Sequence, residues 1–190
     1  AVATLERMNT LPGGQAIRMN VNVSRRELVH PQFLSNVRDV IARMTVEPAR
    51  LRFEITETAV SGSASIPVSE LLRELKELGV DILLDDFGAG LSSLSLLRTL
   101  PLDGIKIDRA FIERSTGDAQ AITILNAIIS LGRNLGKAIT VEGVAEPAQV
   151  ATILALGGDL AQGYLFGRPV PLEEAESLLG ADFSGSCAAA

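Results

Sequence analysis

The chain has 190 residues, of which 47% are hydrophobic, so it is long enough to bury one sizeable core. Its formal net charge of −6 argues against binding to DNA, because sequence-independent binding depends on clustered Lys and Arg. One Cys and one His exclude an internal disulfide and a structural zinc site. No apolar run approaches a membrane span and no signal peptide is visible, so we expect a cytoplasmic protein without membrane contact.

Short, continuously apolar runs predict β-strands that are buried on both faces, as in parallel sheets. In chain order these are Ala16–Val23, Leu51–Thr56, Val80–Leu84, Gly104–Ile107, Ala138–Val141 and a weaker run at Asp159–Tyr164. Helical patterns with Pro or a capping residue at the start, or Gly or Pro beyond the end, lie around them. The predicted helices are Val2–Met8, Pro31–Met44, Val68–Leu78, Ser92–Leu100, Asp118–Leu135, Pro147–Leu156 and Pro171–Leu179.

This alternation of strands and helices predicts an α/β fold with a parallel sheet. A doubly wound sheet would collect functional residues at one switch point, whereas polar residues end all six predicted strands here, which favours a TIM-like (β/α) barrel. Such a barrel has eight strands. We therefore expect an N-terminally incomplete barrel domain over residues 1–180, with the first strand-helix unit absent. Residues 181–190 read as a tail, either a linker or a cloning remnant.

Polar side chains at the downstream ends of the predicted strands are the main functional signal. They are Asn22, Glu54, Asp85, Lys106, Glu142 and Gln162, and Asp86 adds a further carboxylate. In a barrel of parallel strands all these ends meet at the face where catalysis takes place. Carboxylate and amide oxygens together with an ammonium group predict a hard-metal site that handles phosphate.

The segment Asp85-Asp86-Phe87-Gly88-Ala89-Gly90 is the most specific local pattern. Adjacent side chains of an extended chain point to opposite sides, so one or both carboxylates can reach a metal, and the glycines permit a tight loop close to a ligand. Alternatively the two Asp residues cap the next segment. The apolar residues directly before the two Asp residues favour the metal role, because carboxylates next to a buried strand need a charged partner.

Each remaining candidate has a functional and a structural interpretation. Glu54 is placed to face inward as a ligand or is a solvated strand end, and Glu57 is placed to brace a loop. Asn22 offers a neutral oxygen to a hard cation or simply shapes a turn. Lys106 lies between two Ile residues in a buried strand, where it needs a carboxylate or phosphate partner or forms a salt bridge at the barrel end.

Three later residues complete the set of candidates. Glu142 is placed to act as general base towards water at a metal. Gln162 can donate hydrogen bonds to a ligand and accept them. Arg168 is a candidate for contact with a phosphate or a base edge, or is a surface residue next to Pro169. His30 is interpreted as a helix-entry residue without a catalytic role.

Taken together, the ordered motifs resemble those of the EAL domain family, the cyclic di-GMP phosphodiesterases. The resemblance covers about residues 1–180 and rests on Asn22-Val23-Ser24, Glu54-Ile55-Thr56-Glu57, Asp85 to Leu94, Lys106-Ile107-Asp108, Glu142-Gly143-Val144 and Gln162 to Phe166 with Pro169. It implies a modified TIM barrel that hydrolyses cyclic di-GMP to the linear dinucleotide pGpG in bacterial second-messenger signalling. It also implies a homodimer, with sensory or GGDEF-type domains in a longer parent chain.

The resemblance also implies a role for each matching residue. Asn22, Glu54, Asp85 and Asp86 would bind one or two Mg²⁺ or Mn²⁺ ions. Lys106 and Glu142 would orient and deprotonate the attacking water. Gln162 would help to hold the site together, and Glu57 would anchor the loop that starts at Asp86.

The sequence departs from the family pattern at three points. The Glu-Ala-Leu tripeptide that names the family, whose Glu is a metal ligand in active members, does not occur in the chain. Ala145 stands where a second Glu usually follows Gly-Val, and Leu91 replaces a frequent Tyr. The first departure keeps a second hypothesis open, in which the domain is catalytically inactive and serves as a cyclic di-GMP receptor or a protein-interaction module.

Overall fold

The computed structural model describes residues 1–60, 68–88, 93–113 and 118–179. Its strands are β1 Met19–Asn22, β2 Leu51–Thr56, β3 Asp81–Phe87, β4 Gly104–Ile107, β5 Ala138–Val141 and β6 Leu160–Ala161. Its helices are α1 Val2–Asn9, α2 Arg25–Leu28, α3 Phe33–Ile41, α4 Glu57–Val60, α5 Val68–Glu77, α6 Ser93–Thr99, α7 Ala110–Glu113, α8 Ala119–Asn134, α9 Pro147–Leu156 and α10 Leu172–Ser177. Two 3₁₀ turns, η1 Gly14–Ala16 and η2 Pro48–Arg50, precede β1 and β2.

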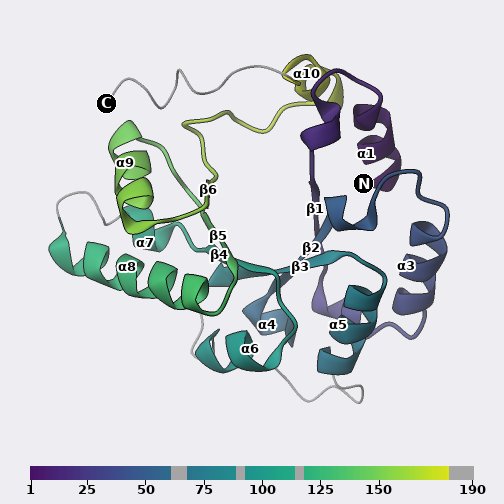
Figure 1. Ribbon diagram of the computed structural model, residues 1–190, viewed down its shortest axis with the longest axis horizontal. Helices are drawn as coiled ribbons and strands as arrows, with labels where there is room; N and C mark the ends of the chain where they lie inside the picture. The colour runs from purple at the N-terminus through teal and green to yellow at the C-terminus, as the bar shows by residue number, and fades with distance from the viewer. Residues whose placement is uncertain (61–67, 89–92, 114–117, 180–190) are drawn as a thin grey trace.

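The six strands form one parallel sheet in the order β1-β2-β3-β4-β5-β6, so each strand pairs with its neighbour in sequence. The sheet curls, and the helices pack around its outer side, as in part of a TIM-like barrel (Figure 1). Among the described residues the sheet is not closed, because β1 and β6 pair on one side only. The expected α/β class and TIM-like architecture are confirmed, whereas the expected absence of a first strand-helix unit stays a prediction.

The core lies between the outer face of the sheet and the helices. The register places Ile55, Leu84, Ile105 and Ile139 in one row across β2 to β5, and each of these side chains is at most 1% exposed. A Cβ atom on Gly132 would lie 2.3 Å from Ile139 Cδ1, so the absence of a side chain there lets α8 approach the sheet closely. The apolar row fixes the pleat and turns the alternate residues to the inner face.

Local sequence signals explain where most elements begin and end. Ser24 and Glu27 form a capping box at α2, and Asp118 accepts hydrogen bonds at the start of α8. Pro147 opens α9, and Gly157 closes it in the left-handed conformation. The predicted bounds of β2, β4, β5 and α9 agree with the observed ones.

Other predicted bounds were wrong. The first strand begins at Met19 rather than Ala16, because Gly14–Ala16 forms the turn η1. The third strand continues to Phe87, so Asp85 and Asp86 lie inside it rather than after it. The short helices α2, α4 and α7 were not predicted, since four residues are too few to show a helical period.

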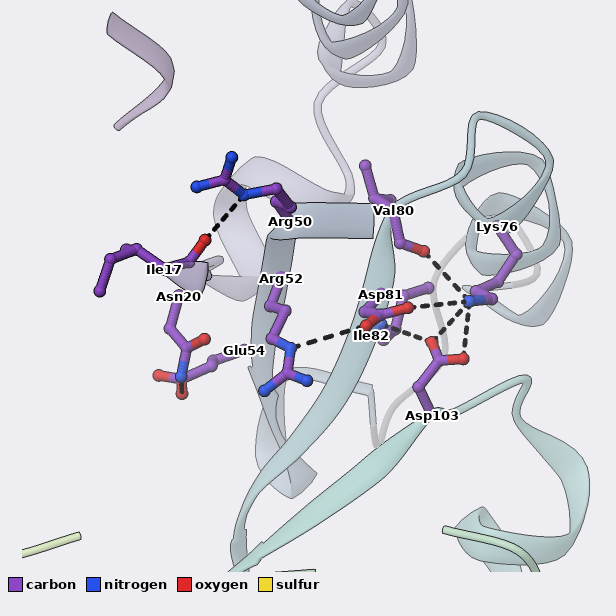
Figure 2. Close-up of polar contacts among 10 residues, drawn as sticks. All are labelled: Ile17, Asn20, Arg50, Arg52, Glu54, Lys76, Val80, Asp81, Ile82 and Asp103. Atoms are coloured by element: carbon purple, nitrogen blue, oxygen red, sulfur yellow. Dashed lines mark hydrogen bonds and ion pairs between the residues drawn. The ribbon is translucent and has the colours of Figure 1, made fainter. Parts of the chain in front are cut away.

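Two basic and two acidic side chains meet at the end of the sheet where the strands begin, and we call Arg52, Lys76, Asp81 and Asp103 the floor cluster (Figure 2). Lys76 Nζ lies 2.6 Å from Asp103 Oδ1 and 3.6 Å from Asp81 Oδ1. Arg52 Nε lies 3.5 Å from Asp81 Oδ2, and Asp103 also accepts a hydrogen bond from the Ile82 amide. The charges balance, so this cluster ties α5, β2, β3 and the start of β4 together.

Candidate metal and phosphate site

Lys106 occupies the centre of the opposite end of the sheet, where the strands end. Its side chain is only 6% exposed, and its ammonium group is 2.6 Å from Glu142 Oε1, 2.8 Å from Glu54 Oε1 and 3.2 Å from Asp85 Oδ1. Four of the residues singled out from the sequence therefore converge, and we call these four residues the carboxylate cluster. One ammonium group faces three carboxylates, which leaves a formal excess of two negative charges.

The Glu54 carboxylate contacts a second residue besides Lys106, and this residue was not predicted to belong to the site. Asn20 donates a hydrogen bond to Glu54 Oε1 at 2.7 Å, as Figure 2 shows. Asn22, the predicted ligand, pairs with Glu54 in the strand register and lines a hollow with it. Residues two apart share one face of a strand, so the spacing of the two asparagines could have predicted that both face the site.

A bulge in β3 brings the adjacent carboxylates Asp85 and Asp86 to the same place. The pairing with β4 steps from Leu84–Ile105 to Phe87–Ile107, so β3 has one residue more than β4 over this stretch. Asp86 has a left-handed backbone with φ of 54°. The simple alternation expected from an extended chain therefore fails here, since a bulge redirects its side chains.

Three carboxylates are close enough to share a cation. Asp85, Asp86 and Glu142 each offer one oxygen, and these oxygens lie within 4.8 Å of one another. Asp85 Oδ1 is buried and makes no hydrogen bond to any described residue, although it lies beside Lys106. Hard oxygen donors with an excess of negative charge fit a divalent cation such as Mg²⁺, Mn²⁺ or Ca²⁺.

The pKa shifts reflect the same crowding of charge. Burial raises the pKa of Glu142, and Asp85 and Glu54 add to this, against the lowering effect of Lys106. Burial and the charges of Asp85 and Asp108 raise the pKa of Asp86. Burial alone would lower the pKa of Lys106, but its hydrogen bonds with Glu142 and Glu54 outweigh burial and raise it. Lys106 thus stays charged.

A cleft of about 390 Å³ opens beside the cluster. Its lining includes Asp86, Asp108, Glu113, Glu142, Gln162 and Tyr164. Glu142 and Gln162 follow directly after β5 and β6, at the strand ends where barrels of this kind place their ligands. Glu142 is the member of the carboxylate cluster that lines this cleft, so a ligand there would contact it directly.

The other predicted residues lie around this centre. Glu57 is 6% exposed and begins α4 directly after β2. Arg168 is exposed and stacks over the ring of Tyr164 rather than joining the carboxylate cluster. The loop that Glu57 was expected to anchor falls largely on residues 89–92, which lie outside the described residues, as do Leu91 and the predicted tail 181–190.

The comparison with known families agrees with this geometry, because the EAL domain model matches residues 1–169. The chain belongs to the EAL domain family. Two curated relatives from Pseudomonas aeruginosa are the cyclic di-GMP phosphodiesterase NbdA, 37% identical over 90% of this chain, and RocR, 34% identical over 83%. The chain spans only 22% of NbdA and 40% of RocR.

Solved EAL structures have the same fold. The EAL domain of Mycobacterium smegmatis DcpA superposes with a TM-score of 0.86 at 33% identity, covering 94% of this chain and 80% of that one. The PaMucR phosphodiesterase in complex with c-di-GMP gives a TM-score of 0.81 at 37% identity, covering 91% and 70%. The resemblance read from the motifs is therefore confirmed. Within the described residues, no helix is long and apolar enough to cross a membrane.

Proposed function

We propose that this domain is a metal-dependent phosphodiesterase that hydrolyses cyclic di-GMP to pGpG. Relatives named cyclic di-GMP phosphodiesterases support this substrate, and so does the likeness to a phosphodiesterase solved with c-di-GMP. The observation that carries the proposal is the charge imbalance around Lys106, where three carboxylates share one ammonium group. A purely structural ion cluster has no need of this excess, whereas a site for a cation and a phosphate diester does.

Asp85, Asp86 and Glu54, with Asn22 beside Glu54, would hold one or two Mg²⁺ or Mn²⁺ ions. When bound, the cations supply electrostatic stabilisation of the phosphate charge and lower the pKa of water. Glu142 is placed at the edge of the cleft, where it can accept a proton from the attacking water. Lys106 holds the Glu142 carboxylate at 2.6 Å and so fixes its orientation.

The reaction forms one bond from the water oxygen to phosphorus and breaks one bond from phosphorus to a ribose 3′ oxygen. The proton lost by water passes to Glu142, and the 3′ oxygen takes up a proton from solvent and leaves as a hydroxyl. The product is a linear dinucleotide with a 5′ phosphate. Gln162 lines the cleft and would hydrogen-bond the ligand. Arg168, which lies over the ring of the cleft residue Tyr164, would contact the ligand from there.

The direct test is to incubate the purified chain with cyclic di-GMP and Mn²⁺ or Mg²⁺ and to separate the nucleotides by chromatography. We expect pGpG to form with the metal and not with EDTA. In Glu142→Gln, turnover should fall by about 10²–10⁴-fold, the typical contribution of a general base, while nucleotide binding is largely kept.

Glu70→Gln on α5 is the matched control, because it removes the same charge from a residue outside the cleft and should leave turnover unchanged. Binding without formation of pGpG would contradict the enzymatic proposal and favour the receptor hypothesis. Full turnover by Glu142→Gln would show that another group is the base. Sensory or GGDEF-type domains, a homodimer and the extent 1–180 of the domain remain predictions that this assay does not address.

A further inference from the structure

Gln149 is a buried polar residue that belongs to neither of the two ion clusters. It is 5% exposed, and it is the one uncharged residue among the buried polar residues that the structure describes. A buried amide is stable only where its oxygen and its nitrogen find hydrogen-bond partners, so the partners of Gln149 show which parts of the chain it joins. It is not among the residues that line the cleft, so any effect on the reaction passes through its neighbours.

The side-chain amide of Gln149 connects two segments of the chain. Its Oε1 accepts hydrogen bonds from the Ala145 amide at 2.8 Å and from the Glu146 amide at 3.0 Å. Its Nε2 donates to the Ile112 carbonyl at 3.4 Å, which places the start of α9 beside α7 (Figure 1). The bonds to the two amides cap α9, as a glutamine at the third helical position commonly does. The bond to Ile112 reaches a different helix, which capping does not require.

Each of these two segments supplies part of the wall of the cleft. Glu113 comes from α7, which follows β4, whereas Glu142 and Ala145 come from the segment that follows β5. Gln149 is buried behind this wall and joins the two parts. Their relative position therefore depends on an amide that a ligand in the cleft does not touch.

The backbone next to Glu142 is held closely against the segment that follows β4. The Glu142 amide donates to the Ile107 carbonyl at 3.1 Å. Gly143 has φ of 75°, and a Cβ atom there would lie 2.3 Å from Arg109 Cβ, so this residue packs directly on its neighbour. Gln149 holds the residues that come next, so the segment is fixed at both ends. Loss of the Gln149 amide would release one end and allow the Glu142 side chain to turn.

We infer that Gln149 is a positioning residue for the hydrolysis, because its amide holds the loop that begins with Glu142 against α7 and so sets how the Glu142 carboxylate meets the attacking water. The inference rests on the proposed function and deepens it. Glutamine suits this position because its oxygen accepts from two N–H groups while its nitrogen donates to a carbonyl. A carboxylate of the same shape only accepts, and the thioether of methionine is no more than a weak acceptor.

Two substitutions separate positioning from helix capping. Gln149→Met removes all three hydrogen bonds and should lower kcat for cyclic di-GMP by about 10–100-fold, as a misplaced base does, with KM within about twofold of the wild-type value. Gln149→Glu keeps the acceptor for the two amides of α9 and should recover most of the melting temperature lost in Gln149→Met. Its kcat should still fall by about tenfold, because the bond to Ile112 is lost.

Two control variants separate positioning from a general loss of stability. Gln120→Met makes the same chemical change at an exposed residue in the first turn of α8. Ile153→Val lowers the stability of α9 from its buried face without touching the loop. Both variants should keep the wild-type kcat at a temperature where they stay folded, and melting temperatures check that every variant folds.

A double-mutant cycle tests whether Gln149 acts through Glu142. In a Glu142→Gln background, Gln149→Met should change the residual turnover by less than about twofold, because the base that it positions is already absent. An equal loss of turnover in both backgrounds would show that the substitution weakens the whole domain, and it would overturn the inference.

Amide hydrogen exchange adds a readout that does not depend on turnover. In Gln149→Met the amides of Ala145 and Glu146 should exchange at least about tenfold faster than in the wild-type chain, and unchanged protection of both would overturn the inference. If the wild-type chain forms pGpG and Gln149→Met keeps the wild-type kcat, the inference is wrong and the phosphodiesterase proposal stands. If the wild-type chain forms no pGpG with Mn²⁺ or Mg²⁺, both are wrong.

Discussion

The two ends of the same sheet carry ion clusters of opposite character. At the floor, Arg52 and Lys76 face two aspartates, so cations and carboxylates balance. At the other end, Lys106 faces three carboxylates. Buried charges are stable only when they are compensated, so the balanced cluster is complete by itself, whereas we propose that a cation would complete the unbalanced one. The balance of charge, rather than burial alone, distinguishes the functional end from the structural end.

The largest expected contrast comes from removing the central cation of each cluster. Lys106→Met leaves buried carboxylates without a partner and should destabilise the metal-free domain by about 3–5 kcal/mol. Lys76→Met removes a lysine whose side chain is 30% exposed and should cost less, about 1–2 kcal/mol. Urea unfolding in EDTA measures both. Added Mn²⁺ should stabilise Lys76→Met by the same amount as the wild-type domain, because the proposed cation site is intact, and should stabilise Lys106→Met by more, because the cation replaces the missing positive charge. Equal gains in both variants would contradict the comparison.

A second contrast lies within β3, where Asp81 and Asp85 share one face at opposite ends of the strand. A divalent cation at 100 times its dissociation constant should stabilise the wild-type domain by about 2.7 kcal/mol. Asp85→Asn should abolish most of this gain because it removes an anionic ligand, while Asp81→Asn should keep it. Thermal unfolding with and without Mg²⁺ or Mn²⁺ measures the difference. A gain that survives in Asp85→Asn would place the cation elsewhere.

The smallest contrast separates the two asparagines of β1. Asn20→Ala removes the hydrogen bond to Glu54 and should lower the stability of the metal-free domain by about 1 kcal/mol. Asn22→Ala should leave that stability nearly unchanged and weaken cation binding, as expected for a ligand. Titration calorimetry with Mn²⁺, together with urea unfolding in EDTA, measures both effects. If only Asn20→Ala weakened cation binding, the assignment of Asn22 as a ligand would be wrong.

Much of the architecture was predictable because its signals are local. The continuous apolar runs located all six strands, and Pro147 and Gly157 marked both ends of α9. The short helices were missed because capping signals without a helical period are indistinguishable from turns. The floor cluster was also missed. Its four residues come from separate segments and form no motif, so only folding brings Lys76 to Asp81 and Asp103.

The amino-acid sequence by itself determined which residues stand at the strand ends. Apolar runs mark the buried strands, and Pro, Gly and capping residues mark where helices begin and end, and both signals are local. Only the tertiary structure decided which of those residues contact one another. It inserts a bulge at Asp86, pairs Glu54 with Asn20 and Lys106, and groups Asp85 and Asp86 with Glu142. The physical reason is that charge compensation and strand register depend on neighbours distant in sequence, which no local pattern specifies.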